Sequence, residues 1–390
     1  MTERMKFVVA LQRGVSMTEA CRQFGISRKT GYKIWGRFQG EGPEALRDRS
    51  RAPRTQPNRT PPELEGAILR LRKAHPTWGS KKLLAALERD APDVAWPARS
   101  TIDEILRRAG LVQPRKQRRR GKQPSAPPVV EATQPNDAWS MDYKGWFRVG
   151  DGTRCDPLTI NDVSSRSSLV CRAMVAPKLE DVKQRLQEAF YDYGLPRQML
   201  SDNGPPFASH GLGKLSRLGV WLIRLGVEPV FIEPGKPYQN GRHERFHDTL
   251  RVETAAPPKR TIPAQQRAFA DFQVVYNEER PHEALDMRVP AEVYDFSTRQ
   301  MPAELPEHEY AVELEVRSVR RDGSIKWDGG YVFVGEAFRG ERVALREAGE
   351  EVFHVFLGPR LLGALHTRSR TIAPIREVPD GVTHVPGQAS

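Results

Sequence analysis

Two proline-rich, basic segments divide this chain of 390 residues and limit what it can fold into. Residues 47–62 read RDRSRAPRTQPNRTPP, and residues 113–134 read QPRKQRRRGKQPSAPPVVEATQ. Closely spaced prolines remove backbone donors and favour extended conformations, so neither segment can continue a helix or a central strand. A chain of this length also exceeds a single ordinary hydrophobic core. We therefore expect several separately folded domains joined by two linkers.

The positive charge of the chain is concentrated in its first third. Residues 1–125 hold 28 Lys and Arg against 12 Asp and Glu, a net charge of +16, whereas the remaining 265 residues have a net charge of −4. An arm this basic beside a nearly neutral remainder is typical of a protein that binds a polyanion such as DNA. A basic surface that serves only solubility is the alternative.

Other bulk properties argue against several classes of protein. No stretch approaches the roughly 18 apolar residues of a transmembrane helix, and MTERMKFVVALQRG at the start has too short an apolar core for a signal peptide. Cys21, Cys155 and Cys171 form no CxxC pair, so neither a disulfide framework nor a zinc site is expected. We therefore expect no membrane association and a reducing bacterial cytoplasm, where the protein would lie with the nucleoid DNA.

Residues 1–46 show the order helix, turn, basic helix. A short apolar-periodic helix over 5–12 precedes MTEACRQF, which Ser16 can cap, and RKTGYKIWGRF, which Ser27 can cap. The Gly-Ile-Ser turn between the last two completes a helix-turn-helix pattern. An ordinary three-helix bundle with a charged face is the alternative. The DNA contacts expected from the last helix are Arg28, Lys29 and Lys33.

A second helical unit is expected over residues 63–112. Helical patterns cover 63–74, the segment that starts at Ser80, and TIDEILRRAG, which ends on Gly110. This order predicts a second, winged-type helix-turn-helix, so that two modules would read a longer DNA site than one. The two linkers would follow phosphates or the minor groove, or serve as plain tethers. The expected DNA contacts of this unit and the linkers are Arg51, Arg54, Arg59, Lys81, Lys82, Arg115, Lys116, Arg118, Arg119 and Arg120.

Residues 135–300 change to strands followed by alternating helices and strands. DAWSMDYKGWFRV, CDPLTINDVSS and SSLVCRAMVA are three β-type runs with turn signals between them, which predicts an antiparallel meander. The helix LEDVKQRLQEAFYDYG, the strand RQMLSD, a further helix and the strand EPVFI follow. Such an order predicts a mixed α/β layer domain.

Three acids of this domain stand where a metal site would form. Asp142 interrupts an apolar β-run, Asp202 ends a strand before Asn-Gly-Pro, and Glu244 lies on a helix among cations. Open α/β sheets place ligand sites at the carboxyl ends of their strands. Three converging carboxylates would form a hard-oxygen site for Mg²⁺ or Mn²⁺, and two such ions serve phosphoryl transfer. For Glu244 alone, a solvated helix with an intrahelical ion pair is the alternative.

Four motifs in order carry a resemblance to a known family. WSMDYKG, SDNGPPF, PYQNGRHE and YNEERPHEALDMRVPAEVY together resemble the D-D-E pattern of insertion-sequence transposases with a retroviral-integrase-like core. The resemblance covers residues 135–295 and, more loosely, the helix-turn-helix arm. It implies an RNase H-like fold with a five-stranded mixed sheet and DNA strand transfer. It also implies that Asp142, Asp202 and Glu244 are catalytic acids that bind two Mg²⁺ or Mn²⁺ ions.

Other residues near the third acid have lesser expected roles. Asn240 is positioned to cap the Glu244 helix, and Asp162 matches an acid of the family's second strand that we expect to be structural. The stretch between the second and third acids is longer than the family's commonest spacing, and we place the extra length in residues 215–230. The cations expected to hold DNA phosphates here are Lys236, Arg242, His243 and Arg251.

Residues 305–372 consist of short β-runs separated by glycine turns. This pattern predicts a small five-stranded barrel. The family often carries an SH3-like barrel at this place, for contacts with DNA or between subunits. Residues 373–390 are expected to form a tail.

These features together predict a DNA transposase. It would bind the terminal inverted repeats of a mobile element, cut DNA with divalent metal, and join the freed 3′-OH to target DNA. A dimer or tetramer on double-stranded DNA is expected, because joining two ends needs two active sites. A catalytically silent DNA-binding regulator and an RNase H-like hydrolytic nuclease are the alternatives.

Removal of residues 1–112 tests whether the basic arm carries DNA recognition. We expect the shortened protein to lose its preference for element ends over unrelated DNA. The slope of log affinity against log salt should also flatten, by roughly 0.9 for each phosphate that the protein no longer neutralises. Fluorescence anisotropy titrations at several NaCl concentrations measure both quantities, with the full-length Asp142→Asn variant as a control that should bind normally. Retained discrimination by the shortened protein would show that recognition lies elsewhere.

Overall fold

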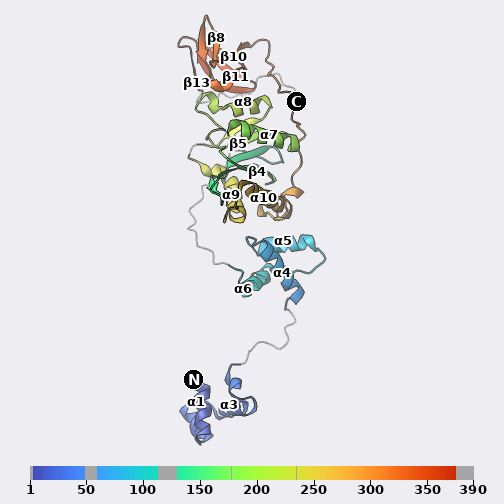
Figure 1. Ribbon diagram of the computed structural model, residues 1–390, viewed down its shortest axis with the longest axis vertical. Helices are drawn as coiled ribbons and strands as arrows, with labels where there is room; N and C mark the ends of the chain where they lie inside the picture. The colour runs from blue at the N-terminus through green and yellow to red at the C-terminus, as the bar shows by residue number, and fades with distance from the viewer. Residues whose placement is uncertain (1–2, 49–58, 113–129, 177, 234, 375–390) are drawn as a thin grey trace. The chain divides into compact units, whose positions relative to one another are not determined.

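The computed structural model describes residues 3–48, 59–112, 130–176, 178–233 and 235–374 (Figure 1). By their packing these residues form two compact units that divide after Pro61.

The first unit is a small helical domain. It consists of α1 (Glu3–Gln12), α2 (Met17–Gln23), α3 (Arg28–Glu41) and the 3-10 helix η1 (Pro43–Leu46). Phe7 and Val8 fill its core. The hydroxyl oxygens of Ser16 and Ser27 accept hydrogen bonds from backbone amides three residues on, at 3.3 and 3.2 Å. Both expected N-caps are therefore confirmed.

The second unit begins with a module of three helices. They are α4 (Pro62–Ala74), α5 (Ser80–Asp90) and α6 (Arg99–Arg108). Their apolar sides meet around Ile68, Trp78 and Leu83, each at most 1% exposed. No strand occurs among the described residues 59–112, so the expected wing is absent from this part of the chain. Pro92 and Pro97 in the connection between α5 and α6 remove donors that a strand there would need.

The central domain of the second unit is built on a mixed sheet of six strands rather than the expected five, because the first expected β-run forms two strands. Its strands are β1 (Ala138–Tyr143), β2 (Phe147–Arg148), β3 (Arg154–Asp162), β4 (Ser168–Met174), β5 (Gln198–Ser201) and β6 (Glu228–Phe231). β1, β3 and β4 form the expected antiparallel meander, while β5 and β6 add in parallel beyond β1. In the ladder between β1 and β3, Asp142 lies opposite Thr159.

Helices cover both faces of this sheet (Figure 1). They are α7 (Leu179–Tyr193), α8 (Arg217–Arg224), α9 (Gly241–Thr254) and α10 (Ile262–Val274). Trp139 and Met141 of β1 point into the core shared with α7 and α8. Ser140 and Asp142 alternate with them and face α9, which packs on α10 through Phe246. The predicted mixed α/β layer domain is confirmed.

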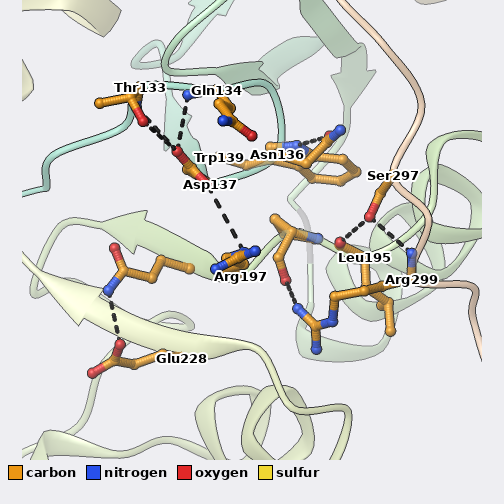
Figure 2. A network of polar contacts seen from close by, with 12 residues as sticks. Thr133, Gln134, Asn136, Asp137, Trp139, Leu195, Arg197, Glu228, Ser297 and Arg299 are labelled. Atoms are coloured by element: carbon orange, nitrogen blue, oxygen red, sulfur yellow. Dashed lines mark hydrogen bonds and ion pairs between the residues drawn. The ribbon is translucent and has the colours of Figure 1, made fainter. Parts of the chain in front are cut away.

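A buried asparagine fixes the start of β1. Its Oδ1 accepts hydrogen bonds from Trp139 Nε1 at 2.9 Å and from the Tyr294 hydroxyl at 3.0 Å. Its Nδ2 donates to the Asp295 carbonyl, and its backbone amide donates to Asp162 Oδ2, both at 2.8 Å. Figure 2 shows this residue, Asn136, beside Trp139. The polar contacts tie the sheet to a residue 159 positions later, which no local sequence pattern reveals.

The C-terminal domain has two separate sheets around one core. The larger sheet has the order β13-β12-β11-β10-β7, and the smaller is the hairpin β8-β9. The strands are β7 (Glu315–Ser318), β8 (Ser324–Trp327), β9 (Gly330–Phe333), β10 (Arg342–Gly349), β11 (Val352–Leu357), β12 (Arg360–His366) and β13 (Thr371–Ala373). No ladder among the described residues closes either sheet on itself, so the expected five-stranded SH3-like barrel is not confirmed.

Helix α8 contributes to two hydrophobic cores. Leu218 and Trp221 pack in the core of the central domain, whereas Val220 and Ile223 pack in the core of the C-terminal domain. A helix that is apolar on all sides must be covered on all sides. The long stretch over residues 215–230 therefore contains a helix, α8, that is packed between two domains.

Gly194 ends α7 in a crowded place and offers a test of this packing. Its φ is 79°, and a Cβ there would lie 2.7 Å from the Ser297 carbonyl oxygen and 2.8 Å from that of Arg299. Figure 2 shows Ser297 and Arg299 against the neighbouring Leu195. We expect Gly194→Ala to lower the free energy of unfolding by roughly 2 kcal/mol or more, through backbone strain and steric conflict.

Gly145→Ala is the matched control for that substitution. Gly145 also has a positive φ, 86°, but no atom lies within 4 Å of the added Cβ. Its replacement should cost only about 1 kcal/mol from backbone conformation. Thermal and urea unfolding of the full chain compare the two variants, and equal losses would contradict the crowding at Gly194.

Candidate active site

Three acids from three elements lie around the carboxyl end of β1. Asp142 is the fifth residue of β1, Asp202 directly follows β5, and Glu244 lies in the first turn of α9. Because β1 and β5 are parallel neighbours, their carboxyl ends share one edge of the sheet. The fold therefore brings the first two acids together, and α9 crosses the same face beside them.

The acids interact electrostatically. Burial is the main cause that raises the pKa of Asp142 to about 7, and the negative charge of Asp202 adds to it. A hydrogen bond from the Tyr143 backbone opposes this rise in the pKa, and Glu244 contributes a smaller increase. Among the described residues, none of the three carboxylates has an ion-pair partner. Their mutual repulsion is therefore not offset by a cation of the described protein.

The donor chemistry of the three acids fits a hard divalent cation. Carboxylate oxygens are the ligands that Mg²⁺ and Mn²⁺ prefer, and a bound cation would offset the repulsion at Asp142. Across the described ranges, however, no group of three Asp, Glu, His or Cys side chains is arranged closely enough to hold a metal ion. The three acids therefore interact electrostatically, but their side chains are not arranged as a complete set of metal ligands.

Neighbouring amides hold two of the acids. Asn240 Nδ2 donates a hydrogen bond to Asp142 Oδ2 at 3.2 Å, and the Gly204 backbone amide donates to Asp202 Oδ1 at 3.0 Å. The expectation that Asn240 caps α9 with its side chain is wrong, because that side chain turns to Asp142 and makes no cap hydrogen bond. The residue therefore links the start of α9 to the end of β1.

His243 is buried between α9 and the sheet. Its side chain is 1% exposed, and Nδ1 lies 2.8 Å from Ser140 Oγ while Nε2 lies 2.6 Å from Thr159 Oγ1. Burial, and to a lesser extent His247, lower the pKa of His243 well below its usual value. Its expected role as a phosphate contact is wrong, since a buried neutral ring cannot reach or attract a phosphate. Burial likewise lowers the pKa of His247 to about 4.

Two arginines converge on the carbonyl of Val163, a residue that pairs with Ala138 at the start of β1. Arg166 Nη1 donates to the Val163 carbonyl at 2.8 Å, and Arg242 Nη1 donates to the same oxygen at 3.3 Å. No carboxylate among the described residues forms an ion pair with either guanidinium group. Burial, then the neighbouring Arg242, lower the pKa of Arg166 to about 10, which leaves it charged at neutral pH. Sequence reasoning found Arg242 and missed Arg166, which stands alone in a serine-rich turn.

The other expected phosphate contacts near the site are engaged in ion pairs. Arg251 lies 3.5 Å from Asp248 on α9, and Lys236 pairs with Glu233. Both cations are on the surface, where such pairs are weak and exchange readily with other anions.

Asp162 has the structural role expected of it. It is 1% exposed, and its Oδ1 accepts hydrogen bonds from the Ser165 amide and hydroxyl, both at 2.7 Å. Its other oxygen accepts from the Asn136 amide. With these bonds it closes the turn between β3 and β4.

The cations expected to contact DNA elsewhere fall into three groups. Arg28, Lys29 and Lys33 are exposed on α3, and Arg59 is exposed before α4. Lys81 pairs with Glu283, whereas burial and Arg280 lower the pKa of the half-buried Lys82 to about 8. The remaining expected contacts, Arg51, Arg54, Arg115, Lys116, Arg118, Arg119 and Arg120, lie outside the described residues. Within the described part of the chain, no helix is long and apolar enough to cross a membrane.

Models of known protein families match most of the chain in pieces. Residues 3–54 match a helix-turn-helix domain and residues 30–106 a homeodomain-like domain. Residues 132–237 and 225–290 each match an integrase core domain. Residues 314–372 match the C-terminal domain of IS481 family transposases.

Two proteins of bacterial insertion elements are similar over the greater part of their length. One is the 39.2 kDa protein of insertion element IS476 from Xanthomonas euvesicatoria, 28% identical over 62% of this chain and 68% of that protein. The other is the 31.7 kDa protein of IS407 from Burkholderia multivorans, 28% identical over 59% of this chain and 79% of that protein. The sequence matches confirm the resemblance to insertion-sequence transposases with an integrase-like core.

Solved structures give weaker likenesses. A chain of the simian T-cell lymphotropic virus intasome has a TM-score of 0.37 at 16% identity, over 75% of this chain and 97% of that one. The HTLV-2 integrase catalytic core domain, solved in complex with magnesium, has a TM-score of 0.32 at 14% identity, over 42% and 98%. Structural similarity this weak does not establish a shared fold or function.

The burial of Asp142 and its repulsion by Asp202 predict a gain in stability when its charge is removed. Because the folded pKa, about 7, exceeds the usual 3.8, the folded protein holds a proton that the unfolded chain has already lost. The free energy of unfolding therefore falls as pH rises from about 4 to about 7. Asp142→Asn should recover roughly 2–4 kcal/mol at pH 8, at 1.36 kcal/mol per pKa unit.

Thermal melting in EDTA at pH 5 and pH 8 measures this gain. Asp142→Asn should melt at a higher temperature than wild type at pH 8. This difference in melting temperature should be smaller at pH 5, and it should also become smaller when MgCl₂ is added at pH 8. Asp248→Asn is the control, because Asp248 is exposed and its substitution should change the midpoint little. An Asp142→Asn protein that melts at or below the wild-type temperature at pH 8 would contradict a destabilising charge on Asp142.

Proposed function

From its resemblance to insertion-element transposases with helix-turn-helix domains and an integrase core, we propose that this chain is a DNA transposase. It binds the terminal inverted repeats of a mobile element and catalyses DNA cleavage and strand transfer with Asp142, Asp202 and Glu244. The observation that carries the proposal is that Asp202 and Glu244, from separate motifs, both act on Asp142 at one edge of the sheet. Exposed cations on α3 support sequence recognition by the first module.

The proposed chemistry consists of two displacements at phosphorus. Water first attacks the phosphate at the element end, its oxygen bonds to phosphorus, and the bond to the 3′ oxygen breaks to leave a 3′-OH. That 3′-OH then attacks a target phosphodiester, and the target's own 3′-OH leaves. Asp142, Asp202 and Glu244 would hold two Mg²⁺ or Mn²⁺ ions, which when bound supply charge neutralisation and Lewis acidity.

The chain's other residues have roles in binding and orientation under this proposal. Asn240 orients the carboxylate of Asp142, and the Gly204 amide orients that of Asp202, each through one hydrogen bond. Arg166 and Arg242, which have no carboxylate partner among the described residues, would bind DNA phosphates. Two active sites are needed to join two ends, so we propose a dimer or tetramer on DNA. We also propose the domain boundaries that the sequence predicts, with the catalytic core at residues 135–300.

Single neutralising substitutions test the catalytic assignment. Asp142→Asn, Asp202→Asn and Glu244→Gln should each lower cleavage and strand transfer by roughly 100-fold or more, since each removes a proposed ligand of the metal site. Binding of end DNA should persist, because we assign it to the N-terminal modules. Gel assays in Mg²⁺ with duplexes that carry the repeats flanking the gene measure all three activities.

Asp248→Asn is the matched control for these variants. It neutralises an exposed acid of the same helix, four residues after Glu244, and should react like wild type. Wild-type rates in all three neutralised variants would overturn the assignment. A wild-type protein that binds ends without cutting would instead be a regulator, and one that cuts without end preference or joining would be a nuclease.

A further inference from the structure

A chain of buried hydrogen bonds runs between α9 and the strand that carries Asp142. Ser140 Oγ lies 2.8 Å from His243 Nδ1, and His243 Nε2 lies 2.6 Å from Thr159 Oγ1. The Thr159 hydroxyl donates to the backbone carbonyl of Asp142 at 3.1 Å. The Nε2 atom of His247, one helical turn after His243, lies 2.8 Å from the same hydroxyl oxygen.

The single proton of Thr159 sets the direction of these bonds. A hydroxyl donates once and accepts up to twice. Since that proton goes to the Asp142 carbonyl, Nε2–H of His243 and Nε2–H of His247 must both donate to Thr159 Oγ1. A neutral His243 with its proton on Nε2 then accepts from the Ser140 hydroxyl at Nδ1. This arrangement satisfies the four contacts and ends on the peptide group of Asp142. It leaves two longer contacts unmade, from Ser140 Oγ to the Asn161 carbonyl at 3.4 Å and from Asn161 Nδ2 to His243 Nε2 at 3.5 Å.

The polar character of this contact is confined to the part of α9 that carries Glu244. His243 and His247 flank Glu244 and meet the polar residues of β1 and β3. Phe246, which lies between the two histidines in the sequence, and Leu250 enter an ordinary apolar core. An apolar contact would hold the helix to the sheet equally well, whereas directional bonds specify one position of the helix along the strand.

We infer that Thr159 and His243 are positioning residues that fix the backbone of Asp142 relative to the turn of α9 that bears Glu244. Thr159 contacts Asp142 through its hydroxyl, and His243 transmits the position of α9 to that hydroxyl. Neither side chain touches the reacting atoms. The inference rests on the proposed function, because it assumes that Asp142 and Glu244 act together.

Two substitutions of Thr159 separate the hydrogen bonds from packing. Thr159→Val keeps the β-branched shape but removes the hydroxyl, whereas Thr159→Ser keeps the hydroxyl but removes a methyl group. We expect Thr159→Val to cut end DNA on the order of 10- to 100-fold more slowly, as for supporting residues of metal sites. It should also need more Mg²⁺ for half-maximal cleavage. Thr159→Ser should stay near wild type in both measurements.

A purely structural role predicts the reverse order of the two variants. Loss of the methyl group would then harm Thr159→Ser more, and the Mg²⁺ requirement of folded protein would not change. Cleavage is therefore measured well below the melting temperature, with end binding determined on the same samples. Ser140→Ala, which removes the first bond of the chain, should shift cleavage and Mg²⁺ requirement in the same direction by a smaller factor.

The outcomes distinguish this inference from the proposed function. Wild type and Asp142→Asn are run in parallel, and cleavage by Asp142→Asn would overturn the proposed function itself. With that control inactive, equal activity of Thr159→Val and Thr159→Ser would overturn the positioning role. So would an unchanged Mg²⁺ requirement in both Thr159→Val and Ser140→Ala.

Discussion

The alternation of side chains along β1 is the constraint on which the central domain depends. Successive residues of a strand face opposite sides of the sheet, so one strand both closes the core through Trp139 and Met141 and presents Asp142 to α9. A slip of one residue against β3 would exchange the two sets. Asn136 opposes such a slip at the start of the strand, where its amide group holds Trp139. Core packing and acid geometry therefore depend on the same few residues.

Features written in short stretches of sequence were predicted well. Ser16 and Ser27 cap their helices, Gly194 ends α7, and the meander of β1, β3 and β4 has the expected order. Each of these follows from local backbone chemistry that a few neighbouring residues determine. The three acids were selected from local settings of the same kind, at the end of a strand or in a short motif, and their catalytic role stays a prediction.

Features that depend on distant partners were not predicted. The helix GRHERFHDTLR reads as charged throughout, yet His243 is buried because Ser140 and Thr159, 103 and 84 positions earlier, offer partners for both of its ring nitrogens. The Asn240 side chain does not cap its helix but donates a hydrogen bond to Asp142, 98 positions earlier. The open C-terminal sheets likewise depend on which edges pair, and short β-runs with glycine turns do not encode that choice. Local patterns reveal residue types and periods, and the tertiary fold decides which side is inside.

Helix α8 makes the central and C-terminal domains depend on each other, because its residues belong to both hydrophobic cores. Val220 and Ile223 complete the C-terminal core from within the central domain, and Arg360 of the C-terminal domain donates a hydrogen bond to the Pro229 carbonyl of β6. Recombination between related genes can exchange a domain freely only where few contacts cross the junction. A junction near residue 300 would separate α8 from the surface that covers it and leave its apolar side chains in water. The central and C-terminal domains must therefore change together, as one evolutionary unit.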